Sequence, residues 1–221
     1  MTKEKLIENL IEEGYLKTPV IIDAFKEIDR ADFIAEDQFD IAYINQPLSI
    51  GEDQTISQPL TVAFMLELLE PKSGDRILDI GTGSGWQAAL LANIISKNDK
   101  NKSGKVITIE RIEKLKVIAE ENFKKYNFIK KEVIETVLGD ATKGYKPEAP
   151  YDKIVVAAAG DKISESWKKQ LKVGGKIVAP LESSIYVYNK ISEEEFEKKQ
   201  YFGFTFVPLV RGVVRGYNKE S

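Results

Sequence analysis

The chain has 221 residues, of which 43% are hydrophobic and 30% charged, and it contains no cysteine and no histidine. The absence of both residue types excludes a disulfide framework, thiolate chemistry, imidazole metal sites and a Ser-His-Asp triad. The 32 basic and 35 acidic residues give a formal charge of −3, which argues against a dedicated duplex-binding surface. Any catalysis must therefore proceed without a tuned imidazole or thiol.

The N-terminal sequence predicts a helical extension ahead of the main sheet. A helix is expected over Thr2–Glu13, ended by Gly14, and a second helix begins at Thr18-Pro19. Residues 31–58 are predicted to be mostly loop, and Pro59–Glu70 a third helix. The first residues alternate charged and apolar side chains, and no apolar stretch is long enough to span a bilayer. We therefore expect a cytoplasmic protein without membrane association.

From Arg76 onward, short apolar runs alternate with helical patterns, which is typical of a parallel sheet with right-handed crossovers. The predicted strands are Arg76–Ile80, Lys105–Glu110, Glu135–Leu138, Tyr151–Ala158, Lys176–Ala179, Ile185–Asn189 and Tyr201–Val207. The predicted helices between them are Trp86–Ile95, Ile112–Asn127 and Ser164–Leu171, and the charged stretch Ser192–Gln200 is predicted as a solvated turn or helix.

The last predicted strands follow one another without a long helix, so we expect an antiparallel edge on an otherwise parallel, doubly wound α/β sheet of the Rossmann-like kind. We expect one domain over residues 1–221. Its parts are a helical extension with a substrate loop (1–70), a cofactor-binding half (71–160) and strands that complete the sheet (161–221).

A glycine-rich loop, Asp79-Ile80-Gly81-Thr82-Gly83-Ser84-Gly85-Trp86, lies between the first strand of the sheet and the next helix. Glycines at this place let the backbone approach a ligand and turn sharply into the helix. The dinucleotide pattern requires a sixth-position glycine where this chain has Trp86, which disfavours a dehydrogenase. Asp79 would repel a pyrophosphate and attract the ammonium group of an amino-acid moiety.

Acidic residues also end the next two predicted strands. Glu110, followed by Arg111, ends the second strand, where a carboxylate can accept hydrogen bonds from both ribose hydroxyls. Gly139-Asp140 ends the third, where an acceptor can take an adenine amino group. Because parallel strands bring their carboxyl ends to one edge of the sheet, we expect these residues to border one crevice.

The spacing of Asp79, the Gly81–Gly85 loop, Glu110 and Asp140 resembles that of the class I S-adenosylmethionine-dependent methyltransferases. The upstream segment, with Thr55-Ile56-Ser57-Gln58-Pro59 at its end, resembles the substrate segment of the protein-L-isoaspartate O-methyltransferases. Further similar stretches are Ala149–Val156, Gln170–Pro180 and Phe206–Leu209, so the resemblance runs over about residues 18–209.

The resemblance implies S-adenosyl-L-methionine as the methyl donor and the α-carboxylate of an isoaspartyl residue in a damaged protein or peptide as the acceptor. The ester then closes to a succinimide that hydrolyses partly to normal aspartate. The implied cofactor-binding residues are Asp79, Gly81, Thr82, Gly83, Ser84, Gly85, Glu110, Arg111, Gly139 and Asp140. Ser57 and Thr55 are the implied catalytic residues, and Ile56, Gln58 and Val207 would contact the substrate. We expect a monomer without a metal ion and without a nucleic-acid partner.

The sequence leaves the role of Ser57 and the nature of the acceptor open. Ser57 can instead be a plain N-cap of the helix that starts near Pro59. Asp53 stands where the family usually has glycine, and Glu52 where it often has an aromatic residue or histidine. Their charges would oppose an anionic acceptor if they point inward. Asn45 stands where the family generally has aspartate. The chain can therefore also be a methyltransferase with another acceptor, such as an aspartate side chain, or a non-catalytic module that binds S-adenosylmethionine or its product.

Overall fold

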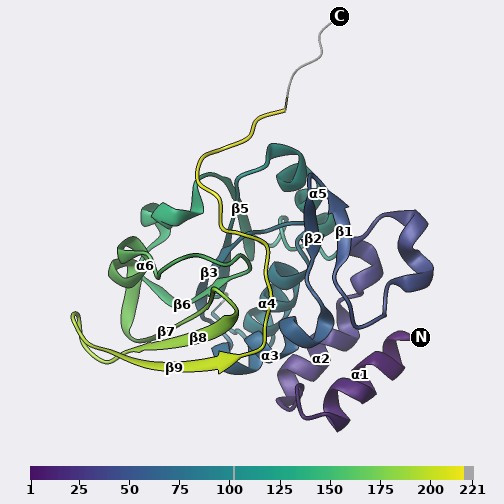
Figure 1. Ribbon diagram of the computed structural model, residues 1–221, viewed down its shortest axis with the longest axis horizontal. Coiled ribbons are helices and arrows are strands. Elements are labelled where there is room, and N and C mark those ends of the chain that lie inside the picture. Colours follow the sequence, from purple (N-terminus) through teal and green to yellow (C-terminus); the bar gives the residue numbers. More distant parts are fainter. Residues whose placement is uncertain (102, 217–221) are drawn as a thin grey trace, which may run out of the picture.

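The computed structural model describes residues 1–101 and 103–216, and its centre is a seven-stranded sheet with the strand order β5-β4-β3-β6-β7-β8-β9 (Figure 1). Neighbouring strands from β5 to β7 are parallel, and β8 and β9 add antiparallel to β7. The strands are β3 (Arg76–Ile80), β4 (Lys105–Glu110), β5 (Ile134–Leu138), β6 (Tyr151–Val156), β7 (Leu171–Leu181), β8 (Ser184–Lys190) and β9 (Phe196–Phe202). The predicted doubly wound sheet with an antiparallel edge is confirmed.

Helices cover both faces of this sheet. They are α1 (Lys3–Glu12), α2 (Pro19–Glu27), α3 (Pro59–Leu69), α4 (Trp86–Ser96), α5 (Glu113–Lys125) and α6 (Glu165–Gln170). Alternate residues of β3 point to opposite faces, so that Ile77 packs with α3 and α4 in one core while Leu78 packs near Trp167 of α6 in the other. The N-terminal helices α1 and α2 enlarge the first core, which confirms the predicted helical extension. Among the described helices, none is both long and apolar enough to cross a membrane.

Two predictions of secondary structure were wrong. The last strand is not Tyr201–Val207 but β9, which pairs with β8 along Phe196–Phe202, so the charged stretch Ser192–Gln200 is largely strand. β9 is the outermost strand and most of its side chains are exposed, so its sequence carries charge instead of an apolar alternation. Residues 203–207 leave the sheet instead of continuing it.

The predicted loop of residues 31–58 contains a β-hairpin. Its strands are β1 (Leu48–Gly51) and β2 (Gln54–Ile56), and two short 3-10 helices, η1 (Arg30–Phe33) and η2 (Glu36–Ile41), precede it. Strands this short show no usable alternation of polar and apolar residues. The hairpin was therefore invisible in the sequence pattern.

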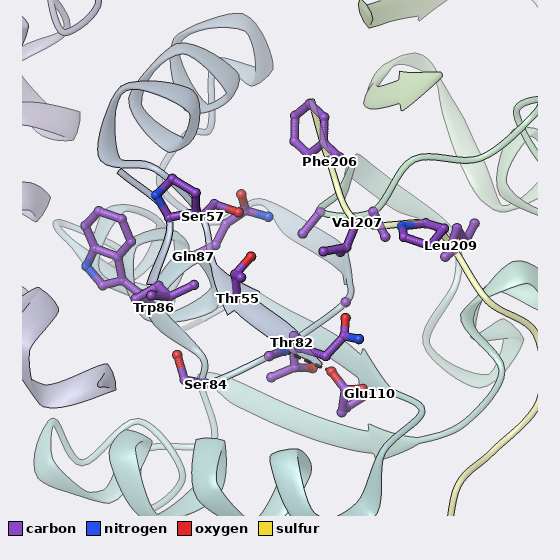
Figure 2. A pocket seen from close by; sticks show the side chains of 18 of the residues that line it. Thr55, Ser57, Thr82, Ser84, Trp86, Gln87, Glu110, Phe206, Val207 and Leu209 are labelled. Carbon is purple, nitrogen blue, oxygen red and sulfur yellow. Dashed lines mark hydrogen bonds between the residues drawn. The ribbon is translucent and has the colours of Figure 1, made fainter. Parts of the chain in front are cut away.

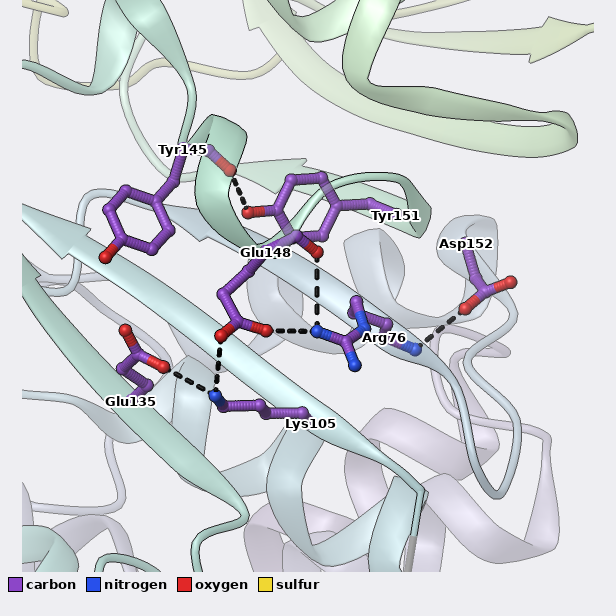
Figure 3. Close-up of polar contacts among 7 residues, drawn as sticks. All are labelled: Arg76, Lys105, Glu135, Tyr145, Glu148, Tyr151 and Asp152. Atoms are coloured by element: carbon purple, nitrogen blue, oxygen red, sulfur yellow. Dashed lines mark hydrogen bonds and ion pairs between the residues drawn. The ribbon is translucent and has the colours of Figure 1, made fainter.

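The amino ends of the central strands are fixed by a polar cluster far from the glycine loop (Figure 3). Lys105 at the start of β4 contacts Glu135 of β5 at 2.5 Å and Glu148 at 3.1 Å, and Glu148 also pairs with Arg76 at the start of β3. The backbone N–H of Arg76 donates to Asp152 of β6 at 2.9 Å. Both cations have carboxylate partners, so this cluster ties strands together and leaves the opposite edge free for a site.

Candidate functional site

A cavity of about 370 Å³ lies at the carboxyl ends of β3, β4 and β6, a volume within the range of small-molecule sites (Figure 2). The β1–β2 hairpin and the C-terminal strap, here residues 204–216, enclose it. Hydrogen bonds of the strap with Ala159 and Arg111 hold it across the strand ends. The cavity is lined by Gln54, Thr55, Ile56, Ser57, Gln58, Gly81, Thr82, Gly83, Ser84, Trp86, Gln87, Glu110, Arg111, Ala141, Val207 and Leu209, among others.

The glycine loop forms the floor of this cavity and leads into α4. Gly85 is the N-cap of α4 with a φ of 100°, and a Cβ there would lie 2.6 Å from the Phe123 ring of α5. Only glycine therefore allows the loop to pass so close to α5. Ser84 is buried, and its hydroxyl has no hydrogen-bond partner among the described residues. This hydroxyl and the amino end of α4 together suit the anionic end of a ligand.

Glu110 presents a fixed carboxylate to the cavity. It is 5% exposed, and its Oε2 accepts from the Gly83 N–H at 2.9 Å. Its Oε1 accepts from the N–H groups of Arg111 at 2.8 Å and Ile112 at 3.0 Å. Both lone pairs of Oε1 are therefore used, whereas Oε2 keeps one lone pair and can accept a hydrogen bond from a ligand hydroxyl without moving.

Asp79 lies behind the glycine loop and does not line the cavity. It is fully buried, and it accepts hydrogen bonds from Gln87 Nε2 at 2.8 Å and Thr108 Oγ1 at 2.7 Å. Burial raises the pKa of Asp79 to about 6, although both hydrogen bonds act in the opposite direction. The Thr108 hydroxyl lies 2.6 Å from that of Thr82. Asp79 therefore acts on the cavity through Gln87 and Thr82, which do line it.

Gly139 and Asp140 are also outside the cavity surface. One oxygen of Asp140 accepts from the N–H and the hydroxyl of Thr142, and the other accepts from the Gly212 N–H of the strap at 3.2 Å. Partial burial raises the pKa of Asp140, but these hydrogen bonds outweigh it and the net shift is downward. Arg111 binds the Gly212 carbonyl at 3.3 Å. Asp140 and Arg111 thus anchor the strap, and Ala141 is the residue of this turn that reaches the cavity.

The substrate-segment residues Thr55, Ile56, Ser57 and Gln58 all line the same cavity, and Val207 of the strap lines it as well. Ser57 is not the helix cap. The N-cap of α3 is Gln58, which makes no side-chain cap bond. Asn45 fills that role, since its Oδ1 accepts from the Leu60 N–H at 3.0 Å. Among the described residues, the Ser57 hydroxyl makes no hydrogen bond, so it is available to a ligand.

A sequence model of the protein-L-isoaspartate(D-aspartate) O-methyltransferases matches residues 1–214. The chain belongs to this family. A Methanopyrus kandleri protein-L-isoaspartate O-methyltransferase is 39% identical, with 94% of this chain and 91% of the relative covered. An Ignicoccus hospitalis relative with the same name is 42% identical, with 94% and 97% covered. A Plasmodium falciparum structure described as such an enzyme, in complex with S-adenosyl-L-homocysteine, matches with a TM-score of 0.85 at 26% identity, covering 95% of this chain and 99% of that one.

The acidic departure from the usual sequence of the isoaspartyl methyltransferases lies outside the cavity. Glu52 and Asp53 form the two-residue turn of the hairpin, with φ values of 54° and 55°, as mirror-image hairpin turns require. Glu52 pairs with Lys114 of α5 at 2.8 Å. Neither residue lines the cavity, so their charges do not face the space where an acceptor would lie.

Two residues of the site were missed by sequence reasoning. Gln87 lies in the first turn of α4, where its side chain had no pattern to mark it, although its place two residues after the last loop glycine is a usable signal. Arg30 lies just before the predicted loop, at the start of η1, and is buried at 2% exposure behind Ser57. A single turn of 3-10 helix shows no apolar periodicity that could mark a buried arginine.

Proposed function

We propose that the protein transfers the methyl group of S-adenosyl-L-methionine to the α-carboxylate of L-isoaspartyl residues in damaged proteins and peptides. One observation carries the proposal: the Thr55–Gln58 segment and the glycine loop, which differ in their predicted ligands, line a single cavity. Membership of the isoaspartyl methyltransferase family supports the same reaction.

The residues of the cavity fit the methyl donor. Glu110 Oε2 would accept from a ribose hydroxyl, and Ile112 and Ala141 offer apolar surface beside it for a purine. Ser84 and the amino end of α4 would hold the carboxylate of the amino-acid part, while Gln87 offers its amide oxygen to the ammonium group. When bound, S-adenosyl-L-methionine supplies an electrophilic methyl group on a positively charged sulfur.

The acceptor needs positioning rather than deprotonation. A carboxyl group with a pKa of about 4 is ionised at neutral pH, so no general base is required and the lack of histidine is no obstacle. The Ser57 hydroxyl donates a hydrogen bond to the acceptor carboxylate, and Thr55, Ile56, Gln58 and Val207 form the wall that orients the peptide and limits water. Their contribution is the alignment of the reacting atoms.

Methylation of another acceptor and a non-catalytic role both have less support than isoaspartyl methylation. The Glu52–Asp53 turn was the reason to consider another acceptor, but neither residue lines the cavity, and Glu52 pairs with Lys114 instead. A non-catalytic module would not need the free Ser57 hydroxyl beside an intact methyl-donor site. Four expectations stay predictions: that the protein is a monomer, that it lies in the cytoplasm, that it acts on damaged proteins, and that it binds neither membranes nor nucleic acids.

A methyl-transfer assay tests the proposal. Labelled S-adenosyl-L-methionine is incubated with the protein and either an isoaspartyl peptide or its normal aspartyl twin. We expect a base-labile methyl ester on the isoaspartyl peptide and almost none on its twin. Equal labelling of the two peptides would favour a different carboxyl acceptor, and binding of S-adenosyl-L-homocysteine without methylation of either would favour the non-catalytic module.

A further inference from the structure

Arg30 is a buried cation that closes the base of the β1–β2 hairpin. Its Nη1 donates to the carbonyl oxygens of Ala42 at 2.5 Å and Ile44 at 3.5 Å. Its Nη2 donates to the carbonyl oxygens of Gln46 at 2.9 Å and Ser57 at 3.2 Å. One guanidinium thus joins the backbone before the hairpin to the backbone directly after it.

No carboxylate neutralises this cation within the described part of the chain. The neighbouring Asp29 is engaged elsewhere, by the Tyr43 hydroxyl at 2.7 Å and by Lys3 at 3.5 Å. Burial lowers the pKa of Arg30 to about 10, so the group is still charged at neutral pH. A buried charge that meets only neutral carbonyl groups is costly for the fold, which suggests that its charge has a use.

The position of Arg30 indicates what its charge does. Arg30 does not line the cavity, but the residue whose carbonyl it binds, Ser57, does. Its guanidinium also lies over the Trp86 ring at 5.4 Å, and Trp86 directly follows the glycine loop. Arg30 therefore joins the substrate segment to the methyl-donor site, and one residue, Ser57, separates its guanidinium from the cavity. Charges interact more strongly in a buried region of low dielectric than in water.

We propose that Arg30 is a positioning residue of the methyl transfer, which holds Ser57 in place and, as an unneutralised buried cation, makes the site select a carboxylate over a neutral acceptor. The proposal rests on the isoaspartyl methyltransferase function given above. It assigns the substrate charge preference to a residue outside the cavity wall.

The test compares Arg30→Met, Arg30→Lys and the unchanged protein by calorimetry, each saturated with S-adenosyl-L-homocysteine. The titrants are an isoaspartyl peptide and its isoasparaginyl twin, in which a carboxamide replaces the α-carboxylate. We expect the unchanged protein to bind the carboxylate peptide about tenfold more tightly than the carboxamide. Arg30→Met should bring this ratio close to one, with the affinity for S-adenosyl-L-homocysteine changed by less than about twofold.

Arg30→Lys keeps the charge but cannot reach four carbonyl oxygens, so it should keep the carboxylate preference and lose kcat. A matched control is Lys125→Met, which removes an exposed cation of α5 that contacts Asp32 of η1 at 3.1 Å and should leave the ratio unchanged. Loss of the preference in Arg30→Lys would overturn the charge assignment, even if Arg30→Met does not fold. An unchanged ratio in a folded Arg30→Met would do the same. Failure of the unchanged protein to methylate the isoaspartyl peptide would instead contradict the proposed function.

Discussion

The contribution of Asp79 to the free energy of unfolding depends on pH. Its folded-state pKa of about 6 lies above its ordinary value of 3.8 because the carboxylate is buried. The folded protein therefore holds this proton more tightly than the unfolded chain does. The associated stability is fully present below pH 3.8 and is lost as the pH rises through about 6.

Asp79→Asn should remove this pH dependence. The Thr108 hydroxyl can reverse its hydrogen bond to accept from an asparagine amide, so the network survives the exchange. Relative to Asp79→Asn, the unchanged protein should lose about 3 kcal/mol of unfolding free energy between pH 3.5 and pH 7.5. Urea unfolding of both proteins at the two pH values measures the difference, and parallel pH profiles would contradict a perturbed Asp79.

Ser57 should matter for the peptide and not for the methyl donor. Its hydroxyl has no partner among the described residues, so Ser57→Ala removes only the bond proposed to the acceptor carboxylate. We expect kcat/KM for an isoaspartyl peptide to fall about 10- to 100-fold, the value of one hydrogen bond to a charged group. Ser49→Ala, on strand β1 opposite Thr55 and outside the cavity, is the control for loss of a serine hydroxyl in the hairpin and should act like the unchanged protein. Equal losses in both variants would count against a role for Ser57.

At the scale of elements, the glycine loop depends on its contact with α5. Gly85→Ala combines a φ of 100° with a Cβ placed 2.6 Å from the Phe123 ring, so we expect a loss of about 2–4 kcal/mol of unfolding free energy. Gly174→Ala is the matched control, because its φ of 82° is also positive but no atom lies within 4 Å of the added Cβ. It should cost only about 1 kcal/mol. Denaturant unfolding distinguishes the two, and equal costs would show that packing against Phe123 is unimportant.

The hairpin turn gives a second prediction at this scale. Asp53 holds a positive φ that glycine adopts freely, so Asp53→Gly should stabilise the protein by about 0.5–1 kcal/mol, and Asp53→Ala should destabilise it. Because Asp53 lies outside the cavity, isoaspartyl turnover should change by less than about twofold. A large gain in turnover by Asp53→Gly would instead show that the charge of the turn repels the acceptor carboxylate.

For the whole molecule, the cavity is assembled from the hairpin, the sheet edge and the strap, so a ligand that fills it should stabilise all three together. S-adenosyl-L-homocysteine at 100 times its Kd should add about 2.7 kcal/mol and raise Tm by about 5–10 °C. NAD at the same concentration should leave Tm unchanged, since Trp86 replaces the glycine of the dinucleotide motif. Thermal melts test both, and a shift with NAD alone would point back to a dehydrogenase.

The sequence by itself determined the sheet, the glycine loop and the placing of Glu110 and the Thr55–Gln58 segment. These follow from local patterns, because buried parallel strands are continuously apolar and their carboxyl ends must share one edge. The same reasoning located the antiparallel edge but not its last strand. β9 is defined by backbone hydrogen bonds to β8, and an exposed edge strand leaves no apolar signature.

Only the tertiary structure decided which polar groups face the cavity. Asp79 and Asp140 stand at strand ends as expected, yet one is buried behind the loop and the other anchors the strap through Gly212. Arg30 reaches Ser57 across 27 positions of chain. Burial and hydrogen bonding between distant segments depend on how the chain packs, which a linear pattern of residue types does not contain.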